Sequence, residues 1–255
     1  AGLRPAWDNG TMNELPTATA AEIKISFAGA EAKAAFDALE LDRDEGSRRL
    51  IHFWDRPQWA ADGTVTLPLL GQGIILRRRR DDEGPESERE TDLTVKLRPC
   101  PPLPERWRED REDEGWKFKI EDDRTGPEFT PMVSASLEAE GGPPELLLIE
   151  QQRELLGVAG LTEADLADLT GLGPVRAVKW KDDWDELPGK VAIEEWRTDN
   201  GLRFLEVSVR SDIADAAEVQ AQLEQALRDR DITPPPFGER KTEAVMTALA
   251  RDAHL

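Results

Sequence analysis

Residues 73–80 read Gly-Ile-Ile-Leu-Arg-Arg-Arg-Arg, so a short apolar run passes directly into four consecutive arginines. Side chains alternate between the two faces of a β-strand, which puts Arg77 and Arg79 on the face opposite to Ile74 and Leu76. Two neighbouring arginines repel each other and lose hydration unless an anion or a row of carboxylates lies in front of them. The stretch therefore predicts a strand with one hydrocarbon face and one face that meets negative charge.

Two later stretches repeat this layout. Residues 93–98 read Leu-Thr-Val-Lys-Leu-Arg, and residues 116–121 read Trp-Lys-Phe-Lys-Ile-Glu. Three strands with charge on one face indicate a sheet that curves around a charged interior. Taken alone, the arginine run is also typical of a solvated strand edge or a surface row of ion pairs, and Arg78 and Arg80 are expected at the surface.

The composition narrows the possible functions. The chain has 255 residues and a formal net charge of −20, so general nucleic-acid binding is not expected and any basic surface has to be enclosed. The single cysteine excludes an internal disulfide, and two histidines exclude a three-histidine zinc site. The sequence contains no apolar run of about 18 residues that could span a membrane. We therefore expect a cytoplasmic protein with no membrane partner.

The hydrophobic pattern divides the chain into strands and helices. Residues 1–19 are expected to be a loose lead-in, and residues 20–255 to form a single domain. Alternation predicts further strands at 21–27, 49–54, 176–181, 191–197 and 203–210. Helical periodicity and capping residues predict helices at 29–41, 144–156, 163–169, 213–230 and 239–253. The charged segments 81–92 and 99–115 are expected to be long loops.

The order of these motifs resembles the CYTH family, the triphosphate tunnel metalloenzymes. Residues 73–79 resemble the family's Gly-Ile-x-Leu-Arg-x-Arg strand, which is the most specific match. Residues 51–55, Ile-His-Phe-Trp-Asp, resemble its Tyr-Phe-Asp-Thr segment. Residues 93–96 resemble its Leu-Thr-x-Lys strand, and residues 204–208 its late Phe-x-Glu-x-Glu/Ser strand. The resemblance is scattered over most of residues 20–250.

Two positions depart from the family's pattern. The family opens with Glu-x-Glu-x-Lys, whereas the corresponding register here is Ala20-x-Glu22-x-Lys24. In the late strand, Ser208 follows Glu206 where many members have a second glutamate. Each change removes a carboxylate that could bind a metal ion.

The resemblance implies an α+β fold, a closed antiparallel β-barrel of about eight strands around a tunnel, with helices packed on the outside. Known members hydrolyse inorganic triphosphate, thiamine triphosphate or RNA 5′-triphosphate ends, or cyclise ATP. The leading expectation is therefore metal-dependent hydrolysis of a linear triphosphate. The alternative is a catalytically weak or inactive member that binds polyphosphate or a nucleotide as a sensor or scaffold, which Ala20 and Ser208 favour. Nothing in the sequence marks an adenine pocket for a cyclase.

The resemblance and the strand parity together give a candidate site for a small-molecule triphosphate or polyphosphate. The side chains expected to bind it are Lys24, Arg77, Arg79, Lys96, Lys119 and Lys181. The carboxylates expected to hold Mg²⁺ or Mn²⁺ are Glu22 and Glu206, with Glu121 and Glu194 as weaker additions. Glu22 and Lys24 are also the expected catalytic pair. The carboxylates can equally be ordinary ion partners in a barrel, and the oligomeric state, monomer or homodimer, stays open.

Overall fold

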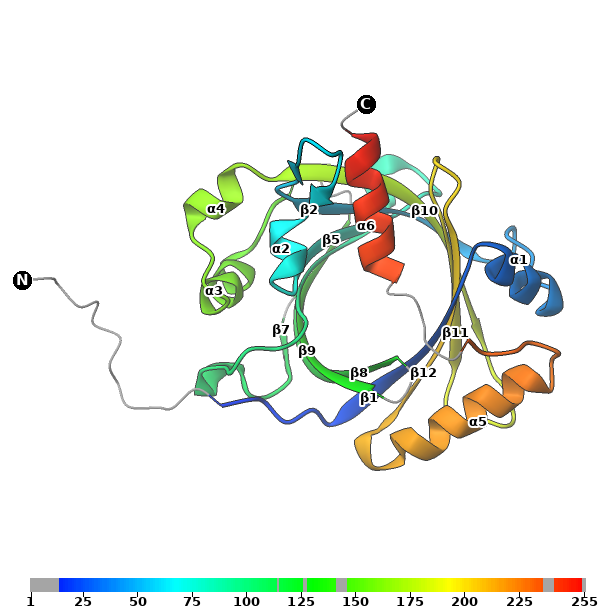
Figure 1. The fold of residues 1–255 in the computed structure, drawn as a ribbon. Helices are drawn as coiled ribbons and strands as arrows, with labels where there is room; N and C mark the ends of the chain where they lie inside the picture. Colours follow the sequence, from blue (N-terminus) through cyan, green and yellow to red (C-terminus); the bar gives the residue numbers. More distant parts are fainter. Residues whose placement is uncertain (1–13, 114, 126–127, 141–145, 236–240, 254–255) are drawn as a thin grey trace, which may run out of the picture.

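The computed structural model describes residues 14–113, 115–125, 128–140, 146–235 and 241–253, and shows a β-barrel viewed along its axis in Figure 1. Ten strands form one sheet in the order β1-β12-β11-β10-β2-β5-β6-β9-β8-β7. Pairing of β1 (Ala20–Ala28) with β8 (Trp116–Thr125) closes nine of these strands into a barrel. The short β3 (Gln58–Trp59) and β4 (Val65–Thr66) form a separate hairpin.

The remaining strands complete the wall. They are β2 (Ser47–Asp55), β5 (Ile74–Asp81), β6 (Glu90–Leu97), β7 (Arg111–Asp113), β9 (Glu128–Glu140), β10 (Thr170–Asp182), β11 (Val191–Arg197) and β12 (Arg203–Asp212). The closed barrel with helices outside confirms the expected fold class. The barrel is mixed rather than purely antiparallel, because an odd number of strands cannot close with every neighbour antiparallel. The parallel pair is β1 with β8.

Strand alternation separates a hydrocarbon exterior from a polar interior. On β1, Ile23, Ile25 and Phe27 are buried on the outer face against α1 (Gly29–Ala38) and α5 (Ala216–Arg228). On the opposite side of the barrel, Ile74 and Leu76 of β5 belong to a second core that includes α3 (Glu150–Val158). The predicted facing of β5 is therefore confirmed.

One helix packs differently from the others. The structure contains α2 (Pro68–Gly71), α4 (Glu163–Ala167) and α6 (Lys241–Asp252) besides the three helices already named, and the short 3₁₀ turns Glu86–Glu88, Glu105–Trp107 and Ile213–Asp215. α6 lies over part of the barrel opening in Figure 1. Its Val245 and Met246 pack with Phe53, Ile75 and Trp196, which point into the barrel interior. The helix thus covers part of one end of an otherwise polar interior with an apolar contact.

Several boundaries differ from those expected. The helix expected at 144–156 begins at Glu150, and part of the expected range lies outside the described residues. The segment 99–115 is not only a loop, since it contains the turn Glu105–Trp107 and β7, and Trp107 is buried. The structure contains no helix long and apolar enough to cross a membrane among the residues described. The single-domain assignment of residues 20–255 stays a prediction.

Arg78, which was expected at the surface, is only 4% exposed. Its guanidinium carbon lies 5.9 Å from the centre of the Trp54 ring, so the side chain lies over this aromatic instead of extending into solvent. Arg80, two residues further along the same face, pairs with Glu86. The alternation was therefore assigned correctly, but the outer face at Arg78 is covered.

A group of charged side chains on the outside of the barrel is neutralised within the chain. Glu195 of β11 is fully buried, and Arg43 donates two hydrogen bonds to it, of 2.7 and 2.8 Å. Arg203 lies 2.7 Å and Arg197 3.5 Å from the same carboxylate. Arg43 and Arg203 also lie over the Phe36 ring of α1. We call Glu195 and its three arginines the outer arginine cluster.

Candidate functional site

The barrel encloses a cavity of about 1080 Å³, as large as the largest ligand pockets, which span roughly 300–1,000 Å³. In the described part of the chain its lining contains ten lysines and arginines and eight carboxylates, although acidic residues dominate the chain as a whole. The cations are Lys24, Arg77, Arg79, Lys96, Arg98, Lys117, Lys119, Lys179, Arg210 and Lys241. Positive charge is therefore concentrated inside the barrel.

Gly73 fixes where the strand that carries the arginines begins. It has φ +78°, and a Cβ atom at this position would lie 2.3 Å from the carbonyl oxygen of Arg98. Only glycine fits this close approach without displacing the backbone. β5 then pairs with β6 so that Ile75 faces Lys96 and Arg77 faces Thr94. Arg77, Arg79 and Lys96 consequently point into the same cavity.

Most of the cations expected at the site do line the cavity. Lys24, Arg77, Arg79, Lys96 and Lys119 are there, but Lys181 is not. Lys181 is exposed and lines a second hollow with Arg49. Lys181 points to the same face of β10 as Lys179, which does line the cavity. It lies two residues further along the strand, a distance of about 7 Å at a rise of about 3.3 Å per residue. The strand therefore carries Lys181 beyond the enclosed space.

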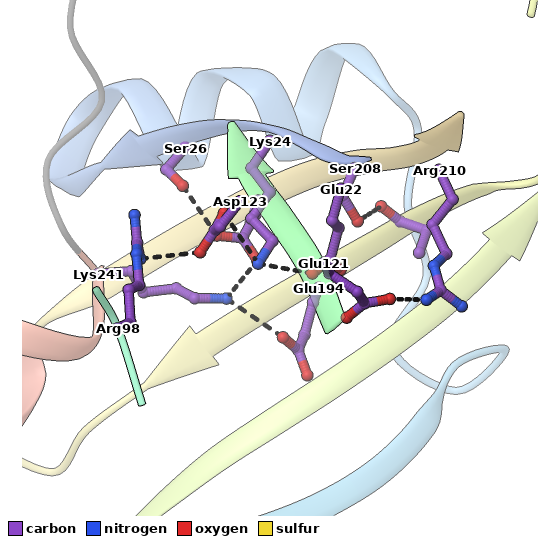
Figure 2. A network of polar contacts seen from close by, with 12 residues as sticks. Glu22, Lys24, Ser26, Arg98, Glu121, Asp123, Glu194, Ser208, Arg210 and Lys241 are labelled. Atoms are coloured by element: carbon purple, nitrogen blue, oxygen red, sulfur yellow. Dashed lines mark hydrogen bonds and ion pairs between the residues drawn. The ribbon is translucent and has the colours of Figure 1, made fainter. Parts of the chain in front are cut away.

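The carboxylates gather on one side of the cavity. We call Glu22, Glu121, Asp123, Glu194 and Glu206 the acidic wall; they come from β1, β8, β11 and β12. Each is paired with a cation of the protein itself, and Figure 2 labels four of these carboxylates, Glu22, Glu121, Asp123 and Glu194. Lys24 lies 2.7 Å from Glu22 and 3.3 Å from Asp123, Arg98 lies 2.9 Å from Asp123, and Arg210 pairs with Glu121.

Lys241 of α6 completes the acidic wall. Its Nζ donates hydrogen bonds to Glu194 Oε2 at 3.1 Å and to Glu206 Oε1 at 2.9 Å (Figure 2). Ser26 Oγ donates to the other oxygen of Glu206 at 3.0 Å. The Lys241 Nζ also lies 4.0 Å from the centre of the Trp196 ring. One ammonium group therefore joins two carboxylates and an aromatic face.

Electrostatics keeps Glu22 and Glu194 of the acidic wall charged. Burial alone would raise the pKa of Glu22, but the charges of Lys24 and Lys96 outweigh burial and hold that pKa well below its usual range. For Glu194, burial likewise opposes ionisation, and Lys241 with Arg79 lowers the pKa to about 2. The pKa of Lys24 is raised, because Glu22 and Asp123 outweigh its burial. The acidic wall is thus a set of stable ion pairs.

The opposite side of the cavity is not balanced in this way. We call Arg77, Arg79 and Lys96 the basic wall. In the described part of the chain Arg79 has Asp92 at 3.9 Å, whereas Arg77 and Lys96 have no carboxylate within ion-pair distance. Burial and the neighbouring Arg77 lower the pKa of Lys96 to about 7, and burial with Arg79 lowers that of Arg77 to about 10. Such a pair of half-buried cations favours a bound anion.

The carboxylates do not fit a metal ion as they stand. Among the residues described, no three Asp, Glu, His or Cys side chains form a group able to hold one. Mg²⁺ prefers octahedral oxygen with free carboxylate lone pairs, but here both oxygens of Glu206 are taken by Lys241 and Ser26. The expected Mg²⁺ or Mn²⁺ stays a prediction, and no chemical step is derived through it.

Several cavity residues were not among those expected. Asp123 and Arg98 continue the strand parity of Glu121 and Lys96, so alternation alone could have identified both. Lys241 lies on a helix near the C-terminus. No local pattern indicates that it contacts Glu194 and Glu206, which are 47 and 35 residues away in sequence. Two of the four carboxylates expected as metal ligands, Glu194 and Glu206, do meet, but around this lysine.

Comparison with known proteins supports the fold. No protein-family model matches the chain, and no curated protein matches it. Among solved structures, it is similar to a candidate adenylate cyclase from Bacillus halodurans, with a TM-score of 0.50 and 11% identity, covering 89% of this chain and 97% of that one. It is also similar to the PH1819 protein from Pyrococcus horikoshii, with a TM-score of 0.41 and 15% identity, covering 89% of this chain and 99% of that one.

The likeness to the Bacillus halodurans structure bears on the fold alone. At 11% identity, this similarity supports the closed β-barrel with outer helices and says nothing of the chain's activity. The barrel encloses a cavity in which a basic wall faces an acidic wall.

Proposed function

We propose that the cavity binds the phosphate chain of a linear triphosphate or polyphosphate. The observation that carries this proposal is the basic wall, where Arg77 and Lys96 line the cavity with no carboxylate within ion-pair distance in the described structure. A phosphate chain supplies the missing negative charge, and arginine offers a planar fork that matches two phosphate oxygens. The likeness to a candidate adenylate cyclase supports the proposal, since the name adenylate cyclase denotes an enzyme acting on a nucleoside triphosphate.

Titration calorimetry with tripolyphosphate in the presence of EDTA tests the proposal. Each charge-assisted hydrogen bond contributes roughly 1.5–3 kcal/mol, so Arg77→Ala and Lys96→Ala should each weaken binding by roughly 10- to 150-fold. Arg80→Ala is the matched control, because this arginine of the same strand pairs with Glu86 and does not line the cavity. The proposal fails if the wild-type protein does not bind, or if all three variants lose affinity equally.

Hydrolysis of the bound triphosphate is the second candidate. The observation that favours it is that Glu22 and Asp123 line the same cavity as the basic wall, so a carboxylate can contact water beside a bound phosphate. The lowered pKa of Glu22 makes this carboxylate a weak base, which counts against rapid turnover. Phosphate release from tripolyphosphate, thiamine triphosphate and ATP, measured in Mg²⁺, Mn²⁺ or EDTA, separates turnover from binding. Binding without release of phosphate in any condition would assign the protein a sensor or scaffold role.

A further inference from the structure

Glu194 and Glu206 form an unusual pair in the barrel wall. They are directly opposite each other on the antiparallel strands β11 and β12, and both point into the cavity. Like charges directly opposite on neighbouring strands destabilise a sheet. The two carboxylate side chains are only 14% and 15% exposed, so water screens their repulsion poorly. A cation is required between them.

The chain supplies this cation from a distant element. The Lys241 side chain is 6% exposed and donates to both carboxylates, with the Trp196 ring against the ammonium group. Burying a lysine is costly unless opposite charges surround it, and here two do. The apolar contacts of Val245 and Met246 in α6 hold the helix against the barrel. Docking of the helix therefore places the ammonium group between Glu194 and Glu206.

A divalent cation would compete for the same position. Two carboxylates side by side on neighbouring strands are a minimal oxygen site for Mg²⁺ or Mn²⁺, which otherwise keep their waters. The Lys241 ammonium group occupies the space between these oxygens at hydrogen-bond distance. A divalent ion between the two carboxylates would be repelled by the ammonium group, which already lies at hydrogen-bond distance from an oxygen of each.

We infer that Lys241 is a tethered cation that takes the place of a divalent metal ion between Glu194 and Glu206. The free protein consequently has no divalent-cation site at these carboxylates while α6 is docked. Combined with the proposed function, on which this consequence rests, the cavity takes up its phosphate ligand without a metal ion at this position. Removal of the Lys241 charge creates a metal site from residues that are already in place.

The inference is tested by measuring Mn²⁺ binding to the protein in the absence of any phosphate. The electron paramagnetic resonance signal of free Mn²⁺ reports how much of the ion is bound. Lys241→Met should bind one Mn²⁺ at least about tenfold more tightly than the wild type, a ratio equivalent to 1.4 kcal/mol. Adding Glu206→Gln to this variant should remove the new site. Lys33→Met, which removes an exposed lysine of α1, should behave as the wild type.

Two outcomes overturn the inference. One is equal Mn²⁺ affinity of the wild type and Lys241→Met. The other is a Mn²⁺ site in the wild-type protein that Glu206→Gln abolishes. Lys241→Gln provides a second variant if Lys241→Met does not fold, because its amide can still donate to a carboxylate while the charge is gone, and it too should gain Mn²⁺ affinity. No phosphate is present, so failure of phosphate binding would appear only in the separate tripolyphosphate titration.

Discussion

Two groups of three cations lie on opposite faces of the barrel wall, and they differ in what neutralises them. In the outer arginine cluster, Arg43, Arg197 and Arg203 surround the buried Glu195 at 2.7–3.5 Å. In the basic wall of the cavity, the described residues offer only Asp92, at 3.9 Å from Arg79. The first group is completed by the chain itself and stabilises the fold. The second is incomplete, which is the property expected of a binding site for an anion.

The largest expected effect on phosphate binding comes from removing two cations of the basic wall. The double variant Arg77→Ala/Lys96→Ala should lose about 3–6 kcal/mol of tripolyphosphate binding, or about 10²- to 10⁴-fold in affinity, if the two contacts add. Stability of the free protein, measured by urea unfolding, should not fall, because two buried cations that repel each other are removed. A large loss of stability with little loss of binding would mean that the basic wall is a structural cluster.

Glu195→Ala tests the opposite half of the comparison. Removing the fully buried carboxylate leaves three arginines without their shared partner. Breaking a buried ion pair costs about 3–5 kcal/mol, and since the arginines are partly exposed we expect about 3 kcal/mol of lost stability in urea unfolding. Tripolyphosphate affinity should stay within about twofold of wild type, given that the cluster lies outside the cavity. A variant as stable as the wild type would contradict the structural role.

The pH dependence of binding follows from Lys96. Its pKa in the free protein is about 7, so it loses its proton above that pH, whereas a bound phosphate chain requires the charged form. The affinity of the wild-type protein for tripolyphosphate should therefore fall by up to about tenfold per pH unit above 7. The affinity of Lys96→Met should lack this decrease, because methionine has no proton to lose. Calorimetry in two buffers of different ionisation enthalpy measures the accompanying proton uptake. Equal proton uptake by both proteins would contradict the assignment.

The same pKa predicts how stability changes with pH. The pKa of Lys96 is lowered in the folded state from 10.5, so between pH 7 and 10.5 the unfolded chain binds more protons. The free energy of unfolding of the wild-type protein should therefore rise with pH across this window, by more than that of Lys96→Met. Urea unfolding at pH 7 and pH 9 provides the comparison. A wild-type stability that falls more steeply than that of the variant would contradict the sign.

Lys119→Ala should have the smallest effect. This lysine lines the cavity, but it already has Asp110 as a partner at 3.5 Å and is about one third exposed. A partner supplied by the chain and access to water both reduce what a ligand gains from the charge, so we expect a loss of about 0.5 kcal/mol, or two- to threefold in affinity. A loss as large as that of Arg77→Ala would show that a partner within the chain does not distinguish the two kinds of cation.

The sequence predicted the strand faces because alternation is a local property. Arg77, Arg79 and Lys96 lie in the cavity as their parity requires, with Ile74 and Leu76 in the outer core. The same rule failed for Lys181, since parity says which face a side chain takes but not where the barrel ends. For Arg78 the parity was right but the expected exposure was wrong, because its outer face is covered in a way that only tertiary packing determines.

Long-range contacts were outside the reach of the sequence. Glu194 and Glu206 were expected to face the same interior, and the register of β11 with β12 places them opposite each other. That Lys241 lies between them depends on how α6 packs over the barrel opening, which no spacing in the chain encodes. The parallel pairing of β1 with β8 was also not predicted. About eight antiparallel strands were expected, whereas nine strands close the barrel, and an odd number requires a parallel pair.

A crystal structure of the protein grown with tripolyphosphate in the presence of EDTA tests the central claim most directly. We predict a phosphate chain inside the barrel, with phosphate oxygens at hydrogen-bond distance from both Arg77 and Lys96 and with Lys241 still bound to Glu194 and Glu206. Phosphate bound only at the outer arginine cluster, or an empty cavity at saturating ligand, would contradict it.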